Sequence, residues 1–378
     1  MLKTGFIGAF AGASLLLLSA CGGAAAPAGT SQSPSTPATA SQAAPAASAA
    51  AKPSQAAASG SAAAKPSAGS PAASAAAKPG TKYKVGASAI NSSLLPIELA
   101  ADYGLYDKYG IGVEFNGTGV GNTTVAAMES GEIAAAYINP SNVAEAVAAG
   151  SGMRSVMSIG QRPSYLLVVT PDITKVEDLK GKNFAVANPG GQASVVAEVF
   201  LAQYGLKQGN GINLLNLGTE PTRTQAVQSG QVAGTIINPT FRDKIGNLKV
   251  LMDLRDQDMG LAGSSLAISS AVLKNQAASE ALVKGTWEGI KLVMDPSQKS
   301  KMIDGLKKYL QVEGAAGEAA YQEMQKDFQG ALPPKLDPTG VQKSMDILAQ
   351  SNPQVKGLPV DKVIDNSIVD RLIQQGFK

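Results

Sequence analysis

Two short stretches carry the residue types best suited to hold a small polar molecule. One reads Asn139-Pro140-Ser141, and the other, 99 residues later, reads Asn238-Pro239-Thr240. An asparagine amide offers donors and an acceptor without a charge, and each neighbouring hydroxyl adds one more of both kinds. The repeated pattern predicts a site for a small polar ligand. The alternative is that both pairs only end strands, since Asn and Pro are common in turns.

The elements around both stretches follow the same order. Met128–Ser141 and Val227–Thr240 each contain the end of a helix, a serine-glycine turn, a buried strand and then the Asn-Pro pair. Strands alternate with helices from Tyr83 onward, which predicts an α/β fold with mostly parallel sheets flanked by helices. Because ligands bind beyond the carboxyl ends of parallel strands, the two copies predict two similar lobes that face a common ligand cleft.

Glycine-rich or serine-rich loops precede three of the predicted helices. Gly190-Gly191-Gln192 comes before a helix expected over Ala193–Tyr204, and Ser88–Ser93 and Gly119–Thr123 are comparable loops in the first half of the chain. The first amides of a helix lack partners and carry partial positive charge, so they suit an anionic or carbonyl oxygen. Such turns also occur in α/β proteins without a ligand. The predicted ligand-binding residues are Ser88, Asn91, Ser92, Asn122, Thr123, Asn139, Ser141, Gly191, Gln192, Ala193, Asn238, Thr240 and Phe241.

The composition excludes several classes of enzyme and site. The chain has no His and one Cys, which excludes Ser-His hydrolysis, histidine zinc sites and a disulfide within the chain. The first 81 residues hold four lysines and no acidic residue, so the other 297 residues contain 28 basic and 29 acidic side chains. A neutral body argues against a nucleic-acid partner, which needs a concentrated basic face. We therefore expect no catalytic residues, no metal site and no cofactor.

The N-terminal residues are typical of an exported protein. The apolar run Phe6–Leu18 follows a lysine and is too short to span a bilayer as a helix, which predicts a signal peptide over residues 1–20. Leu18-Ser19-Ala20-Cys21 resembles the bacterial lipobox, which implies that Cys21 is diacylated and anchors the protein to a membrane. Residues 21–81 are blocks of Ala, Ser and Pro, which predict a disordered linker. This linker is either a spacer or a low-complexity filler.

Three segments of the globular part resemble one known family. Val176-Glu177-Asp178-Leu179-Lys180-Gly181-Lys182 is similar to the start of the second lobe in type II periplasmic binding proteins. Pro96–Tyr106 and Asp361–Val369 resemble the branch that serves ABC importers of nitrate, sulfonates, taurine and thiamine precursors, the NMT1/THI5-like branch. The resemblance covers residues 83–372 and implies a two-lobe fold. The lobes expected from it are residues 82–168 with 262–378 for the first, and residues 169–261 for the second.

The resemblance also implies a function. We expect a monomeric, lipid-anchored, extracytoplasmic solute-binding component that captures a small ligand by hinge closure and passes it to an ABC permease with its ATPase. The crossover segments expected between the lobes are Tyr165–Val169 and Ser264–Ser269. A ligand-sensing receptor of the same fold and an exported hydrolase that uses no histidine are the alternatives. Pyrimidine-synthesising relatives depend on a histidine, and Leu94 lies in the corresponding neighbourhood here, which excludes that reaction.

The arginines limit the charge expected on the ligand. Arg162 lies near the predicted hinge, Arg223 is expected as a solvated helix residue, and Arg242 follows Phe241 in a loop that could reach the cleft. None of them predicts a bidentate fork for a strongly charged oxyanion such as sulfate. A sulfonate-like or nitrate-like anion, a carboxylated organic molecule, or an aromatic precursor stacked on Tyr137 or Phe241 all remain open.

Overall fold

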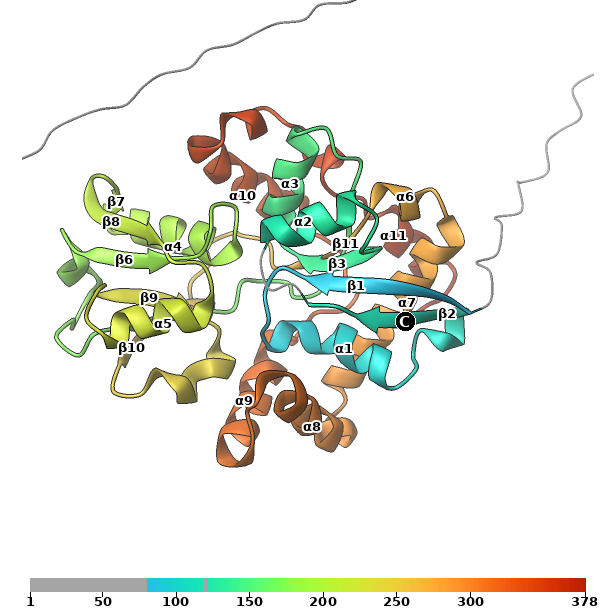
Figure 1. The fold of residues 1–378 in the computed structure, drawn as a ribbon, viewed down its shortest axis with the longest axis horizontal. Helices are drawn as coiled ribbons and strands as arrows, with labels where there is room; N and C mark the ends of the chain where they lie inside the picture. The colour runs from blue at the N-terminus through green and yellow to red at the C-terminus, as the bar shows by residue number, and fades with distance from the viewer. Residues whose placement is uncertain (1–79, 118–120) are drawn as a thin grey trace, which may run out of the picture. The chain divides into compact units, whose positions relative to one another are not determined.

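The computed structural model describes residues 80–117 and 121–378. The predicted signal peptide, Cys21 and nearly all of the predicted linker lie outside these residues, as does Gly119. Within the described ranges, no helix combines the length and the hydrophobicity that a membrane crossing requires. The described chain forms two β-sheets with helices packed on their faces (Figure 1).

Five strands form the first sheet. They are β1 (Thr81–Ala87), β2 (Ile111–Phe115), β3 (Ala135–Ile138), β4 (Arg154–Ser158) and β11 (Ser265–Ile268). Their order in the sheet is β2-β1-β3-β11-β4. β1 pairs in parallel with β2 and β3, whereas β11 runs antiparallel to both of its neighbours. Every residue of β3 and β11 is buried, as expected of strands covered on both faces.

Six strands form the second sheet. They are β5 (Leu166–Val169), β6 (Asn183–Val186), β7 (Lys207–Gln208), β8 (Gly211–Asn216), β9 (Gly234–Ile237) and β10 (Lys249–Asp253). Their order is β10-β5-β9-β6-β8-β7. β9, β6, β8 and β7 run parallel, and β5 is antiparallel to β9 and β10. Both sheets are therefore mostly parallel with one reversed strand each, which confirms the predicted fold class.

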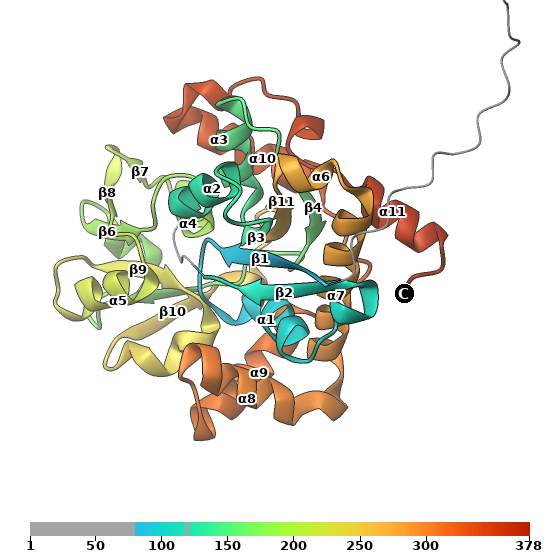
Figure 2. The same cartoon turned by 45° about the vertical axis from the view of Figure 1, so that its right-hand side comes forward.

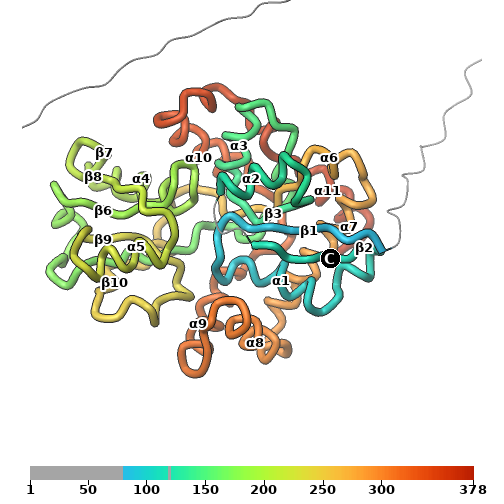
Figure 3. Tube along the Cα trace, in the orientation of Figure 1, coloured from blue at the N-terminus to red at the C-terminus, as the bar shows by residue number. Residues whose placement is uncertain are grey.

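The chain crosses between the two sheets twice (Figure 3). The reversed strand of each sheet, β5 or β11, is the first strand that the chain forms after a crossing. β5 follows β4, and β11 follows β10. Between them the two crossing segments run side by side, because the N–H of Ile159 donates to the carbonyl of Ser264 at 2.9 Å and that of Gly263 to the carbonyl of Gln161 at 3.3 Å. The lobe limits expected at residues 168/169 and 261/262 stay a prediction, and β5 itself pairs within the six-stranded sheet.

Alternate residues of the central strands contact different helices, as the two-residue period of a strand requires. In β3, Ala135 and Tyr137 belong to the core that contains α1 (Leu95–Asp102) and α7 (Gln276–Met294). Ala136 and Ile138 belong to the core that contains α2 (Gly121–Glu129) and α3 (Pro140–Ala148). Figure 2 shows these two helix pairs on opposite faces of the five-stranded sheet.

The six-stranded sheet is built in the same way. Its residues Leu167 and Ile236 pack with α4 (Gln192–Gln203), and Leu166 and Ile237 pack with α5 (Glu220–Gln228). The remaining α-helices are α6 (Ser270–Leu273), α8 (Lys299–Leu310), α9 (Gly314–Asp327), α10 (Pro338–Ser351) and α11 (Ser367–Gln374). The 3-10 helices are η1 (Ser92–Leu94), η2 (Asp107–Tyr109), η3 (Val176–Leu179), η4 (Pro239–Ile245), η5 (Leu254–Asp256), η6 (Pro296–Gln298), η7 (Pro353–Val355) and η8 (Val360–Lys362).

The internal repeat has the predicted structure in both copies. α2 ends before Gly131, which adopts a φ of 78°, and α5 ends before Gly230, which adopts a φ of 74°. These left-handed turns lead into β3 and β9, the central strands of the two sheets. Asn139 follows β3 and begins α3, whereas Asn238 follows β9 and begins η4. Both asparagines therefore lie at the carboxyl end of a central strand.

Candidate functional site

A cavity of about 380 Å³ lies beyond the carboxyl ends of the central strands. Four helices begin at its wall. The starts of α2, α4 and α5 line it directly, and α3 contributes Asn139, the residue that precedes its first turn. The loop after β1 and the aromatic rings of Phe241 and Tyr309 complete much of the remaining wall. This enclosure between segments of both sheets has the size expected of a small-molecule site.

Three of the helices that begin at the cavity, α3, α4 and α5, have no side-chain cap. The residues before α3, α4 and α5 are Asn139, Gly191 and Thr219, and none of them makes a side-chain cap hydrogen bond. The first amides of each helix therefore have no partner from a cap, although Pro140 in α3 and Pro221 in α5 carry no N–H. The helix dipole gives each of these ends a partial positive charge. The first two residues of α2, Gly121 and Asn122, also line the cavity. The cavity thus offers several backbone donors to an acceptor oxygen or an anion.

Two residues that line the cavity each have one buried polar atom without a hydrogen-bond partner. These atoms are the hydroxyl oxygen of Ser88 and the carbonyl oxygen Oδ1 of Asn142. Asn142 is 3% exposed, and its Nδ2 donates to Oε2 of Glu145 at 3.4 Å. A buried polar atom without a partner costs about 1–3 kcal/mol.

The loop before α4 packs directly against α3. Gly190 has a φ of 74°, and a Cβ at this position would lie 2.9 Å from Nδ2 of Asn142. The carbonyl of Gly190 accepts a hydrogen bond from the hydroxyl of Ser141 at 2.6 Å. Only glycine fits this close approach without strain. The contact places the start of α4, on the six-stranded sheet, beside the start of α3, on the five-stranded sheet.

Asn139 and Gln192 are oriented by hydroxyl groups from the crossing segments. The hydroxyl of Ser264 donates to Oδ1 of Asn139 at 3.1 Å and lies 3.5 Å from Oε1 of Gln192. The phenol of Tyr165 donates to the same Gln192 oxygen at 3.4 Å. These bonds fix the Asn139 carbonyl, and no acceptor among the described residues bonds its amide nitrogen. Asn139 therefore presents a donor at the cavity wall.

The structure brings together most of the predicted ligand-binding residues. Those that line the cavity are Ser88, Asn91, Asn122, Asn139, Gly191, Gln192, Ala193 and Phe241. Those that do not line it are Ser92, Thr123, Ser141, Asn238 and Thr240. Thr123 is exposed on α2, and Ser141 bonds to Gly190 instead. Tyr137, considered for ring stacking, is buried and does not line the cavity.

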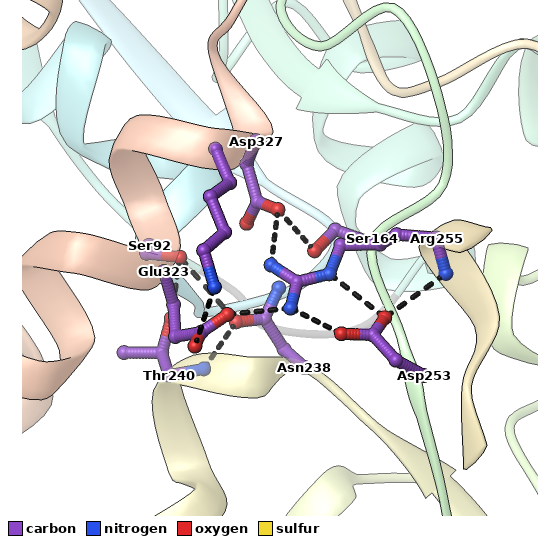
Figure 4. A network of polar contacts seen from close by, with 9 residues as sticks. Ser92, Ser164, Asn238, Thr240, Asp253, Arg255, Glu323 and Asp327 are labelled. Carbon is purple, nitrogen blue, oxygen red and sulfur yellow. Dashed lines mark hydrogen bonds and ion pairs between the residues drawn. The ribbon is translucent and has the colours of Figure 1, made fainter.

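Ser92, Asn238 and Thr240 bond to one another at the edge of the cavity (Figure 4). The hydroxyl of Ser92 donates to Oδ1 of Asn238 at 3.3 Å, and the hydroxyl of Thr240 donates to Oγ of Ser92 at 2.5 Å. Oδ1 of Asn238 also accepts the backbone N–H of Thr240 at 3.0 Å. Ser92 precedes α1 on the five-stranded sheet, and the other two residues follow β9. This cluster joins the two sheets directly.

Sequence reasoning missed several residues on the cavity wall, including Asn142, Asn188, Tyr165, Glu220 and Arg223. The prediction for Arg223 was wrong. This side chain is 3% exposed, and its guanidinium bonds to Thr235 and to backbone carbonyls instead of to solvent. The repeat contained a signal that could have pointed to Glu220. Its offset of 99 residues relates the start of α2 to the start of α5, and therefore Gly121 to Glu220.

Glu220 and Arg223 dominate the charge at the cavity. Burial raises the pKa of Glu220 to about 7, although Arg223 and the backbone N–H of Asn238 favour its ionised form. Burial also lowers the pKa of Arg223, against the attraction of Glu220. Each group therefore stabilises the charge of the other in a poorly hydrated place. The pair leaves this part of the wall close to neutral when both groups are ionised.

A second set of contacts between segments of the two sheets lies at Arg255 in η5. Figure 4 shows its guanidinium pointing between the carboxylates of Asp253, Glu323 and Asp327. The nitrogen–oxygen distances are 2.5 Å to Asp253, 2.5 Å to Glu323 and 3.2 Å to Asp327. Asp327 also accepts the hydroxyl of Ser164 at 2.6 Å. Arg255 thus links the end of β10 to α9.

Comparison with known proteins decides the family. A sequence profile described as NMT1/THI5 like matches residues 91–298, which is more than half of the chain. The chain belongs to this family. The matched residues include the starts of α2, α3, α4 and α5 and both crossing segments. No curated protein matches the sequence.

Solved structures resemble the NMT1/THI5-like chain over most of its described length. A putative periplasmic sulfonate-binding protein SsuA from Methylobacillus flagellatus KT is 17% identical, with a TM-score of 0.62 over 80% of this chain and 97% of that one. The aliphatic sulphonate-binding protein SsuA from Escherichia coli is 20% identical, with a TM-score of 0.59 over 75% and 92%. The nitrate-binding protein NrtA from Synechocystis PCC 6803 is 14% identical, with a TM-score of 0.62 over 78% and 89%. These similarities confirm the periplasmic-binding-protein fold.

Proposed function

We propose that this NMT1/THI5-like protein binds a small polar solute in the cavity and delivers it to an ABC importer. The observation that carries the proposal is the convergence of four helix N-termini on one cavity between segments of the two sheets. Such a cavity favours a ligand with at least one acceptor oxygen or nitrogen. The similar structures named for sulfonate and nitrate binding are consistent with a solute of this kind.

The two sheets would act as two lobes that close on the solute. The crossing segments are the covalent links between them, and a rotation about these segments would open the cavity. The bonds of Ser141 to Gly190 and of Ser92 to Asn238 and Thr240 would then break on opening and form on closure. Closure around a bound molecule excludes water and strengthens each hydrogen bond to it.

A binding role fits the cavity better than an enzymatic one. Ser88 is a hydroxyl on the wall that could act as a nucleophile, but it has no hydrogen-bond partner and therefore no base to activate it. A ligand-sensing receptor would use the same cavity, and the two roles differ in the partner that receives the closed form. Transport by the partner permease in vesicles, dependent on this protein, distinguishes delivery from sensing.

A thermal-shift screen tests the proposal. The panel contains nitrate, 1-propanesulfonate, 2-aminoethanesulfonate, small carboxylates and substituted pyrimidines. A solute at about 100 times its Kd stabilises the native state by about 2.7 kcal/mol, which raises the Tm by several degrees. We expect at least one member to do so and to be recovered chemically unchanged. A panel in which no member shifts the Tm contradicts a solute site in this cavity.

Asn139→Ala should weaken binding of the solute that gives the largest thermal shift. The substitution removes a donor at the cavity wall, so we expect a cost of about 1–3 kcal/mol in affinity by calorimetry. Asn247→Ala is the matched control, because Asn247 is exposed and does not line the cavity. If the two variants bind the solute with equal affinity, Asn139 does not contribute to the binding site.

We also propose that the protein is held at the outer face of a membrane through a lipidated Cys21. Two acyl chains and an acylated amine supply enough buried methylene groups for stable anchoring, whereas one chain does not. Cys21→Ser should move the protein from the membrane fraction to the soluble fraction after export. A Cys21→Ser variant that still sediments with membranes and resists carbonate washing would contradict the lipid anchor.

A further inference from the structure

The charged groups on the cavity wall are unusual for a site that binds a simple anion. In the described part of the chain they are Glu220 and Arg223, both from the first turn of α5. A carboxylate at the start of a helix is favoured by the helix dipole. The same carboxylate repels any anion placed beside it. Its position therefore constrains which end of a ligand can lie near α5.

Glu220 has room to bond a ligand. One of its oxygens, Oε1, accepts the backbone N–H of Asn238. No other hydrogen bond to this carboxylate occurs among the described residues, and the side chain lines the cavity. An ionised carboxylate has about four acceptor positions and no donor. The unused positions of the ionised Glu220 carboxylate can therefore be satisfied by a group that donates, and not by an anion.

Arg223 is committed to the protein wall. Its Nε donates to Oγ1 of Thr235 at 3.2 Å, and its two terminal nitrogens donate to the carbonyls of Gly218 at 2.5 Å and Ile236 at 3.2 Å. These bonds use one N–H group of each guanidinium nitrogen, three of its five N–H groups in all. Arg223 also compensates the charge of Glu220. The anion-binding capacity of the cavity therefore lies at the other helix N-termini.

We propose that Glu220 selects a ligand that presents a nitrogen-bound hydrogen, as a protonated amine or an amino-substituted heterocycle. This inference rests on the proposed function of the cavity. The amino end lies against Glu220, and the acceptor end lies against the starts of α2, α3 and α4. A ligand without the N–H group would leave the carboxylate desolvated and without a ligand partner. This cost would make the protein bind such a ligand more weakly than one that carries the N–H group.

The alternative role for Glu220 is structural. Its bond to the N–H of Asn238 holds the residue that joins the two sheets through Ser92. A purely structural carboxylate would affect every ligand alike when it is replaced. A selecting carboxylate would affect only ligands that donate to it. Pairs of probes that differ in one group separate these two roles.

The test measures calorimetric affinities of isosteric probe pairs for the full chain and for Glu220→Gln. The pairs are 2-aminoethanesulfonate with 1-propanesulfonate, 3-aminopropanoate with butanoate, and 4-amino-2-methylpyrimidine with 2,4-dimethylpyrimidine. In each pair a methyl group replaces the amino group. Gln keeps the size of the side chain and an acceptor for Asn238 but removes the charge. Glu132→Gln is the control, because Glu132 is exposed and lies away from the cavity wall.

In at least one pair, we expect the wild type to bind the amino member at least about tenfold more tightly than the methyl member. A tenfold ratio of the two Kd values is the contribution expected of one charge-assisted hydrogen bond. Glu220→Gln should reduce that ratio to below about threefold with a small change for the methyl partner, and Glu132→Gln should preserve it. For a pair with an ammonium group the preference should grow from about pH 6 to about pH 8, as Glu220 ionises. Arg223 and Tyr165 are the titratable groups that interact with Glu220 in this range, and both keep their protons.

Two other outcomes overturn the inference. If methyl members or nitrate bind and the amino members show no preference, the cavity binds solutes but Glu220 does not select them. If Glu220→Gln weakens both members of a pair equally, the carboxylate is structural. Binding of no probe to the wild type contradicts the proposed function itself. Melting temperatures of all variants show that each one is folded at the temperature of the titrations.

Discussion

Gly263→Ala should destabilise the protein by about 3 kcal/mol, an unusually large effect for the addition of one methyl group. Gly263 lies in the second crossing segment, directly against the first. A Cβ at this position would overlap the backbone carbonyl of Gly160 and lie 3.1 Å from the amide nitrogen of Arg162. Both obstacles are backbone atoms, so no side-chain rotation can make room. The two crossing segments would have to separate.

Gly160→Ala is the matched control for this prediction. Gly160 lies across from Gly263, but a Cβ on Gly160 would meet no atom closer than the carbonyl oxygen of Arg162 at 3.9 Å. We expect its free energy of unfolding to stay within about 1 kcal/mol of the wild type. Urea denaturation followed by circular dichroism measures both variants. Equal stability of the two variants would mean that the crossing segments do not pack backbone to backbone.

Arg255→Met should destabilise the protein by about 3 kcal/mol, because it removes the cation that three carboxylates share. Asp327 is the most buried of the three, with 5% of its side chain exposed, and one of its oxygens already lacks a partner. Burial opposes ionisation of Glu323, but its bond with Arg255 outweighs this and lowers the pKa of Glu323. The same balance lowers the pKa of Asp253.

The sign of the pH dependence follows from these shifts. A carboxyl group whose pKa is lower in the folded state stabilises that state above its unfolded pKa and loses the contribution as it is protonated. Burial raises the pKa of Asp327, so this carboxylate is protonated before the other two as the pH falls. The stability difference between wild type and Arg255→Met should therefore be full near neutral pH, start to shrink as Asp327 is protonated, and shrink further below about pH 4.5 as Glu323 and Asp253 follow. Lys307→Met is the control, since its pair with Glu313 is about two-thirds exposed and water screens the attraction between the two charges. A constant difference across this pH range would contradict a shared charge network at Arg255.

Much of the fold was predictable because local patterns determined it. The alternation of strands and helices, the serine-glycine turns and the Asn-Pro pairs all depend on residues close together in the chain. The two copies of the repeat were found at Met128–Ser141 and Val227–Thr240, and both have the predicted order of elements. The one strand in each sheet that runs against its neighbours depends on how the chain crosses between sheets, which local patterns do not specify.

The site was only partly predictable, because the direction of each side chain depends on the other sheet. Asn139 and Asn238 occupy equivalent places in the repeat, yet Asn139 lines the cavity and Asn238 bonds to Ser92 instead. Arg223 looked like a solvated residue in a polar helix with few apolar side chains. Its burial results from acceptors on β9 and on the loop before α5, which no pattern within α5 reveals.

The central claim is that one solute molecule binds where the four helices begin, and two neighbouring residues of α2 allow a direct test. Asn122 lines the cavity, whereas Thr123 does not, and both side chains are exposed enough to accept a larger one. Calorimetric titration with the solute that gives the largest thermal shift should show one site in the wild type and in Thr123→Trp, and no measurable binding to Asn122→Trp. Equal affinity of the two tryptophan variants would show that the solute binds elsewhere, and the account of this cavity would be wrong.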